Sequence, residues 1–328
     1  MAELVVIDQE LCLNFNYKKM QCRKCQESCR ASCIDENLQI KNTDCNQCGL
    51  CLAACPTEAV AVAGYTRKAL TELSGQVPQI GIVCRKNNSD APWPCLGFVD
   101  GQLLLGLIAD GKEVIIDTTS CEGCKPDVAV YLKMVVDQTN VILRAAQKNS
   151  VRQAKVPVKI QEKGISRRAF FGQLLGAAVE TVREVARPSD SSPERLERSA
   201  LRDKVKNVFA ETNLHQPATV FTGLSISSQC QGCGICTKFC APKAITSVDR
   251  LTELDLVHEP LRCTGCGVCS VHCPVQAINL VAADVLGRHK VITAQLPRCA
   301  SCGELYQPVN NAAVCLECML KSHQAILR

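Results

Sequence analysis

Apolar residues in the middle of the chain change between strand-like and helix-like spacing. VPQIGIVC at 77–84 and KEVIIDT at 112–118 predict two buried strands. Between them, DGQLLLGLIADG at 100–111 predicts a helix that closes at Gly111. A second helical stretch covers 127–146. Strands that alternate with helices in this way indicate a small parallel sheet.

A shorter pattern, a turn that leads into a short strand, occurs three times. Its copies read TEAVAV at 57–62, APKAITSV at 241–248 and PVQAINLV at 274–281. Each copy follows a dense run of cysteines. The pattern therefore predicts that a larger cysteine-rich unit is repeated, once in the first 62 residues and once between 230 and 281.

An amphipathic helix is predicted at 166–185, with Ser166 as its cap. The sequence SRRAFF at its start resembles a twin-arginine export signal, but it is internal and charges return at Glu180, so we expect no function in export. The helix either docks on a partner subunit, packs on this chain or touches a membrane surface. A linker around Pro188 and Pro193 and then a polar helix follow it.

The chain holds 25 cysteines in 328 residues, whereas aromatic residues make up only 4%. Tight C-x-x-C spacings favour metal binding over disulfides, and the start MAELVVIDQELC lacks the features of a secretory signal. No apolar run is long enough for a membrane span. The formal charge of +5 counts thiols as neutral, and cluster-bound thiolates would make it more negative, so it does not indicate nucleic-acid binding.

The segment 230–274 carries two regular runs, C-x2-C-x2-C-x3-C, the second followed by Pro274. It resembles the bacterial two-cluster ferredoxin, in which the fourth cysteine of each run binds the other [4Fe–4S] cluster. The resemblance implies one cluster on Cys230, Cys233, Cys236 and Cys273, and another on Cys263, Cys266, Cys269 and Cys240.

The same unit recurs near the N-terminus, but its first run departs from the pattern. The regular run ends in Cys55-Pro56, whereas the irregular one has an extra residue before Cys29 and no proline after Cys33. Cys12 stands alone and is expected to be a small buried residue on the first strand. The resemblance implies one cluster on Cys22, Cys25, Cys29 and Cys55, and a second on Cys45, Cys48, Cys51 and Cys33.

Four further cysteines follow the predicted strands of the middle segment or precede its first helix. The carboxyl ends of parallel strands meet at one edge of a sheet, so we expect these cysteines to converge. The segment resembles the small [2Fe–2S] subunit that links hydrogenase to heterodisulfide reductase, which implies a fifth cluster. A redox-active dithiol and a zinc site are the alternatives. The four residues are Cys84, Cys95, Cys121 and Cys124.

The C-terminus carries two C-x2-C knuckles separated by twelve residues, a spacing that predicts a closed four-thiolate site. Zinc is the expected metal, and rubredoxin-type iron is the alternative. No lysine or arginine lies between the knuckles, so we expect a structural or docking role. The residues are Cys299, Cys302, Cys315 and Cys318.

Together these patterns predict an α+β multidomain chain of the polyferredoxin type. Two ferredoxin-like domains, each with two [4Fe–4S] clusters, would flank a small α/β parallel-sheet domain and a helical linker, with a zinc-ribbon-like clasp at the end. The expected boundaries are 1–66 for the first ferredoxin domain, 67–150 for the α/β domain, 151–215 for the linker, 216–292 for the second ferredoxin domain and 293–328 for the clasp.

The sequence contains no G-x-G-x-x-G, no P-loop and no nucleophile–base constellation, so we expect no site for substrate chemistry. The leading hypothesis is a cytoplasmic electron-transfer subunit of an anaerobic oxidoreductase complex, rather than a stand-alone enzyme. Its partners would be flavin, molybdopterin or tungsten, or hydrogenase subunits. The alternative is a reductase that uses Cys121 and Cys124 as a dithiol. A redox-sensing regulator that binds DNA ranks last, because the clasp lacks a basic surface.

Overall fold

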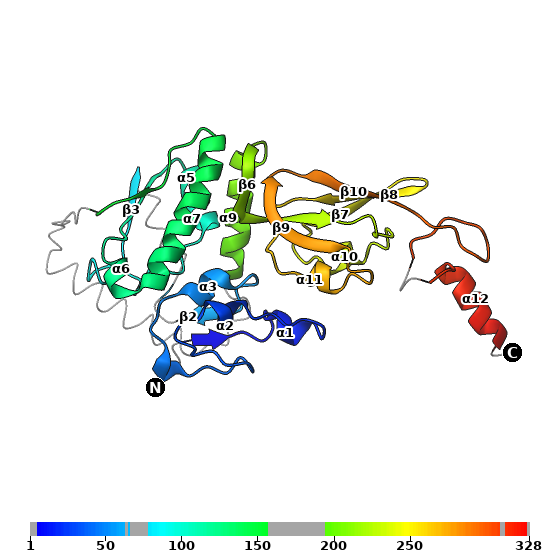
Figure 1. Ribbon diagram of the computed structural model, residues 1–328, viewed down its shortest axis with the longest axis horizontal. Coiled ribbons are helices and arrows are strands. Elements are labelled where there is room, and N and C mark those ends of the chain that lie inside the picture. The colour runs from blue at the N-terminus through cyan, green and yellow to red at the C-terminus, as the bar shows by residue number, and fades with distance from the viewer. Residues whose placement is uncertain (1–4, 63–64, 66–77, 157–193, 309–311, 327–328) are drawn as a thin grey trace, which may run out of the picture.

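The computed structural model describes residues 5–62, 65, 78–156, 194–308 and 312–326, with the side chains of 194–200 and 322–326 left out. The predicted amphipathic helix at 166–185 lies outside the described residues. In Figure 1 the N-terminal part lies below the junction between the middle segment and the second ferredoxin-like part, and the C-terminal helix lies at the far end.

The N-terminal part is closed by a short antiparallel pair of strands, β1 (Val5–Ile7) and β2 (Val60–Val62). Between them lie the short helices α1 (Leu13–Asn16), α2 (Lys24–Ser28) and α3 (Leu50–Ala54) and the 3-10 turn η1 (Asn42–Asp44). The expectation that Cys12 is buried on the first strand was wrong. The strand ends five residues earlier, and Cys12 is a half-buried residue at the start of α1.

The middle segment is a parallel three-stranded sheet in the order β3-β4-β5, as the apolar pattern predicts. Asp100 caps α5, because its carboxylate accepts a 2.9 Å hydrogen bond from the amide of Leu103. The predicted helix at 127–146 is confirmed as α7. The elements are β3 (Gln79–Ile82), α5 (Gly101–Ala109), β4 (Glu113–Ile116), α6 (Cys121–Cys124), α7 (Pro126–Ala145) and β5 (Arg152–Gln153).

The second ferredoxin-like part contains a long bulged antiparallel pair, β6-β9, and an antiparallel sheet in the order β10-β8-β7. The helix α9 precedes it and α12 follows it. The elements are α9 (Glu194–Phe209), β6 (Asn213–Ile226), α10 (Ile235–Phe239), β7 (Ile245–Asp249), β8 (Glu253–His258), α11 (Val268–Val271), β9 (Ile278–Val285), β10 (His289–Gln295) and α12 (Leu316–Ile326).

One hydrophobic core continues from the middle sheet into the second ferredoxin-like part. Helix α9 makes this connection, because its buried Leu201, Val205 and Phe209 belong to the same cluster as Leu103 of α5 and Phe221 of β6. In Figure 1 α9 stands between α7 and the β6-β9 pair. The polar helix that the sequence predicts after the linker therefore has a buried face and joins two parts of the fold.

Within the described residues, no helix has both the length and the apolar character that crossing a bilayer requires.

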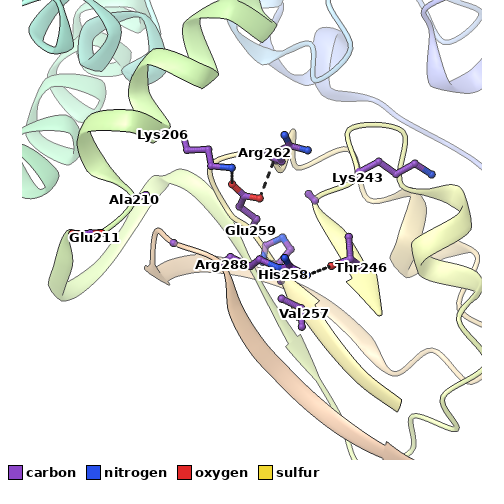
Figure 2. A pocket seen from close by; sticks show the side chains of 12 residues that line it. Lys206, Ala210, Glu211, Lys243, Thr246, Val257, His258, Glu259, Arg262 and Arg288 are labelled. Atoms are coloured by element: carbon purple, nitrogen blue, oxygen red, sulfur yellow. Dashed lines mark hydrogen bonds and ion pairs between the residues drawn. The ribbon is translucent and has the colours of Figure 1, made fainter. Parts of the chain in front are cut away.

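A basic pocket of about 560 Å³ lies where α9 meets the end of β8 (Figure 2). Lys206 and Arg262 reach Glu259 at 2.7 and 3.5 Å and so tie α9 to the loop after β8. His258 lines the same pocket and is only 1% exposed, and among the described residues neither of its ring nitrogens has a hydrogen-bond partner. Ala244 also lines the pocket, and its amide donates a 3.2 Å hydrogen bond to Sγ of Cys240, so the pocket borders one of the cysteine loops described below.

Burial, together with the charge of His289, lowers the pKa of His258 to about 4. The imidazole of an unfolded chain titrates near pH 6.5, so the unfolded state binds more protons between these values. The stabilisation by neutral His258 is therefore complete above pH 6.5 and is lost as the pH falls toward 4. Between pH 7.5 and 5.5, we predict that the free energy of unfolding falls by roughly 1 kcal/mol less in His258→Leu than in the wild type.

The measurement is the apparent unfolding temperature under anaerobic conditions at both pH values. His289→Gln, which leaves His258 in place, serves as the control and should keep most of the wild-type pH dependence. Equal pH dependence in the wild type and His258→Leu would contradict the assignment.

Candidate iron–sulfur centres

Each ferredoxin-like run has one cysteine in a short helix, and in the three regular runs it is the third cysteine. In α3, α10 and α11 this cysteine is the second helical residue, and the residue before each helix is a glycine in the left-handed conformation, at Gly49, Gly234 and Gly267. Glycine adopts this conformation without the steric cost that a Cβ atom adds. The backbone can therefore turn sharply between the second and third cysteines. The third cysteines are Cys51, Cys236 and Cys269, and Cys25 holds the same place in α2.

Backbone amides point at the sulfur of the fourth cysteine in three of the runs. Ala59, Ala244 and Ala277 donate to the Sγ atoms of Cys55, Cys240 and Cys273 at 3.2, 3.2 and 3.3 Å. Amide donors of this kind stabilise a thiolate and tune the potential of a cluster bound to it.

In the second ferredoxin-like part the sulfurs form two crossed groups. Burial raises the pKa of Cys236 to about 12, and the neighbouring thiolates of Cys233, Cys230 and Cys273 raise it further. Burial also raises the pKa of Cys269 to about 12, with contributions from Cys266 and Cys263 and smaller ones from Cys236 and Cys240. The fourth cysteine of each run thus lies beside the other run, as the resemblance implies. We call these the Cys236 group (Cys230, Cys233, Cys236, Cys273) and the Cys269 group (Cys263, Cys266, Cys269, Cys240).

The N-terminal part also brings two sulfur groups together. Burial raises the pKa of Cys25 to about 11, and the thiolates that add to this shift are Cys55, Cys22 and Cys12. Burial raises the pKa of Cys51 to about 12. The thiolates of Cys48, Cys29 and Cys45 raise it further, and Cys25 makes a smaller contribution. We call these the Cys25 group (Cys12, Cys22, Cys25, Cys55) and the Cys51 group (Cys29, Cys45, Cys48, Cys51).

Cys33 lies beside the Cys51 group, because its Sγ is 3.3 Å from that of Cys29. Cys12, which the sequence left without a partner, is in the Cys25 group. The spacing of Cys12 from Cys22 gave no sign of this placement.

The four cysteines of the middle segment converge at the carboxyl edge of the parallel sheet. Burial raises the pKa of Cys121 to about 11, and the thiolates of Cys84, Cys95 and Cys124 raise it further. We call them the middle group. Cys84, Cys95 and Cys121 are buried, whereas Cys124 is exposed.

Asp117, at the end of β4, holds the two cysteine-bearing loops of this site together. Its Oδ1 accepts hydrogen bonds from Nδ2 of Asn87 at 2.9 Å and from Oγ1 of Thr119 at 2.6 Å. Asn87 follows Cys84, and Thr119 precedes Cys121. Asp117 was not predicted from the sequence as a site residue. Its position directly after a buried strand would have indicated this role.

The C-terminal clasp has a different sulfur geometry. The Sγ atoms of Cys299, Cys302, Cys315 and Cys318 all lie within 4.8 Å of one another, and no other group of described His, Cys, Asp or Glu side chains is drawn together so tightly. A single tetrahedral zinc with bonds of about 2.3 Å requires sulfurs about 3.8 Å apart. Cys302 and Cys315 are 3.9 Å apart. The clasp therefore fits one metal ion.

All the groups except the clasp place several buried thiols close enough to repel one another as thiolates. Without metal, the raised pKa values of Cys25, Cys51, Cys121, Cys236 and Cys269 keep these five thiols protonated at neutral pH. Iron would replace the protons and supply positive charge between the sulfurs. The donor set, the glycine-assisted turns and the amide contacts thus fit iron–sulfur clusters.

Comparison with known families agrees with this geometry in two stretches. Residues 229–277 match the 4Fe-4S dicluster domain, and residues 38–61 match the 4Fe-4S binding domain. A search of curated proteins found no match to the chain. The chain is therefore an iron–sulfur protein with ferredoxin-type 4Fe-4S domains, which support a role in electron transfer. The segments that carry Cys12 to Cys33, the middle group and the clasp lie outside both matches.

Proposed function

We propose that the chain is an electron-transfer subunit of a larger anaerobic oxidoreductase complex. It would hold four [4Fe–4S] clusters, a fifth cluster of the [2Fe–2S] type on the middle group, and one zinc or rubredoxin-type iron in the clasp. Bound clusters would supply one-electron redox chemistry with little structural change. The observation that carries the proposal is the continuous series of contacts that links the sulfur groups from the middle segment to the second ferredoxin-like part.

The first link joins the middle group to the Cys51 group. Burial raises the pKa of Cys48. The ammonium of Lys125 in the middle segment lowers this pKa, and the thiolate of Cys95 in the middle group raises it. Lys125 also donates a 2.6 Å hydrogen bond to the carbonyl of Asn46, so it ties the middle segment to the N-terminal loop. Gly97 packs so closely on this loop that a Cβ atom would lie 2.3 Å from the carbonyl oxygen of Cys48.

The second link joins the Cys25 group to the second ferredoxin-like part. Nζ of Lys24, between Cys22 and Cys25 in the chain, donates a 2.7 Å hydrogen bond to the carbonyl of Gly265. Gly265 lies between Cys263 and Cys266, so two cysteine loops face each other.

Aromatic contacts add to the same interface. The ring centroid of Tyr17 lies 6.2 Å from that of Phe239, which stacks on His272 at 4.3 Å. Tyr17 belongs to the N-terminal part and the other two residues to the second ferredoxin-like part. This packing favours a fixed separation between the two parts.

The series of sulfur groups has the middle group at one end and the Cys236 group at the other. The exposed Cys124 marks one end. At the other end, Gly234, which lies between Cys233 and Cys236 in the chain, is near the Gln307 side chain of the segment that leads to the clasp. In Figure 1 α6 lies at the left, and α10 lies to the right of α9, between α9 and α12. We infer that one redox partner docks at each end, where flavin, molybdopterin or tungsten, or hydrogenase subunits would exchange electrons with the chain.

The segment at 166–185 would contribute to docking on a partner, or would provide a peripheral contact with a membrane. The chain would act in the cytoplasm, with no role for SRRAFF in export. No nucleic-acid partner is proposed.

The alternative function, a reductase with a Cys121/Cys124 dithiol, has one observation in its favour. Cys124 is exposed and Cys121 is buried next to it, and an exposed thiol beside a buried one suits dithiol exchange. The two functions make opposite demands on these sulfurs, because a cluster keeps both of them bound to iron.

The first prediction concerns metal content. Anaerobically purified chain should contain about sixteen to eighteen irons and roughly one zinc. Four [4Fe–4S] clusters and one [2Fe–2S] cluster account for the iron, and the clasp accounts for the zinc. Metal and acid-labile sulfide analysis provides the measurement. Iron content below about ten per chain would refute the proposed function.

The second prediction concerns the link between the middle group and the Cys51 group. Gly97→Ala would push the Cys48 loop away from the middle segment, at a cost of roughly 1–3 kcal/mol. We expect slower electron equilibration and weaker magnetic coupling between reduced clusters, both followed by freeze-quench EPR. Gly123→Ala is the matched control, because a Cβ atom there meets nothing within 4 Å. Equal kinetics in the two variants would argue against this route.

The third prediction separates a middle cluster from a dithiol. If the middle group holds a cluster, alkylating reagents should leave Cys121 and Cys124 unmodified in the anaerobic native protein and should modify them once iron is removed. Mass spectrometry of peptides from 112–133 measures the modification. Rapid alkylation with no loss of iron would favour the reductase.

A further inference from the structure

The structure points to a different set of ligands in the irregular N-terminal run, an inference that rests on the proposed function. Its starting point is the register of the short helices. Cys25 is the second residue of α2, the place that Cys51, Cys236 and Cys269 occupy in α3, α10 and α11. Cys25 therefore corresponds to the third cysteine of a regular run, and Cys22 corresponds to the second.

Cys29 then takes the place of the fourth cysteine, the one that crosses to the other cluster. It directly follows α2, as Cys55 follows α3 and Cys240 follows α10. The residue three positions after each fourth cysteine has a positive φ although it is not glycine, an uncommon backbone state. These residues are Ser32 at 49°, Glu58 at 58°, Lys243 at 54° and Gln276 at 51°.

Cys33 occupies the position that is alanine in the other three runs. It lies four residues after Cys29, just as the alanines lie four residues after the fourth cysteines, and an apolar Ile or Val follows each of them. The exposures also agree, at 3% for Cys33, 2% for Ala59, 2% for Ala244 and 1% for Ala277. Cys33 thus fits a small packing residue behind the cluster better than a ligand.

With Cys33 removed from the set, the irregular run lacks a first cysteine, and backbone contacts bring Cys12 to that place. The amide of Asp8 donates to the carbonyl of Ala59 at 2.8 Å, and the amide of Cys12 donates to the carbonyl of Asp8 at 3.0 Å. The amide of Ala59 in turn contacts Sγ of Cys55 at 3.2 Å. Cys12 and Cys55 are therefore held at the same end of the β1-β2 pair.

The nine residues between Cys12 and Cys22 are closed into a loop by the side chain of Asn14. Its Oδ1 accepts from the amide of Cys22 at 2.7 Å, and its Nδ2 donates to the carbonyl of Cys22 at 2.9 Å. This pair of hydrogen bonds holds the backbone of Cys22 next to the start of α1. A nine-residue loop thus replaces the usual two-residue gap, and Asn14 keeps its two ends together.

We propose that Cys12 is a ligand of the first N-terminal cluster, together with Cys22, Cys25 and Cys55. Cys29 completes the second cluster with Cys45, Cys48 and Cys51, and Cys33 binds no iron. The run then reads C-x9-C-x2-C-x3-C. Its last two gaps match those of the three regular runs, so the extra residue before Cys29 is no longer an irregularity.

The test compares Cys12→Ala with Cys33→Ala in the full chain under anaerobic conditions. Cys12→Ala should lose about four irons per chain and the EPR signal of one reduced cluster. Cys33→Ala, which places the residue of the other three runs at this position, should keep the iron content and the EPR spectrum of the wild type. Cys29→Ala is the positive control and should lose iron under either ligand set.

Loss of a cluster in Cys33→Ala, or full iron and an unchanged EPR spectrum in Cys12→Ala, would overturn the proposal. If Cys12→Ala yields no folded protein, Cys33→Ala still decides the assignment, because an alanine is accommodated at this position in the other runs. If the proposed function itself were wrong, the wild-type chain would hold few irons. Failure of the ligand assignment alone would leave the iron content of the wild type unchanged.

Discussion

The structure depends on the repulsion between buried cysteine sulfurs. Folding packs these groups into spaces where burial and neighbouring thiolates both raise the pKa of the thiols, for example of Cys51 and Cys236. A cation between the sulfurs removes this repulsion and takes the place of the protons. With aromatic residues at only 4% of the chain, bound iron supplies part of the organisation that large side chains provide in other small domains.

The backbone around each group meets this constraint in a repeated way. In the three regular ferredoxin-like runs, a left-handed glycine precedes the one-turn helix that carries the third cysteine, and a positive-φ residue lies three positions after the fourth cysteine. In three runs the next amide then points back at the fourth sulfur. In the irregular run Cys33 stands at the position of this alanine, and its Sγ lies 3.3 Å from that of Cys29.

Regular local patterns allowed much of this arrangement to be predicted. The two strands and two helices of the middle segment follow from apolar spacing, and the crossed pairing at 230–273 follows from the ferredoxin resemblance. Two features could not be predicted, because each depends on contacts between distant residues. Cys12 reaches its group through the β1-β2 pair and Asn14, and α9 is polar in sequence but buries Leu201, Val205 and Phe209 between two parts of the fold.

Electron transfer places a stricter demand on the fold than metal binding does, because the separation between neighbouring sites has to stay short and constant. The contacts between parts of this chain meet that demand through backbone groups rather than through flexible side-chain pairs alone. Lys24 and Lys125 each donate to a backbone carbonyl of a cysteine loop, and Gly97 leaves no space between its own backbone and the carbonyl of Cys48. A side chain at Gly97 would have to separate the loops. The smallest residue thus stands where the middle segment and the Cys48 loop pack against each other, and its lack of a side chain lets them stay in contact.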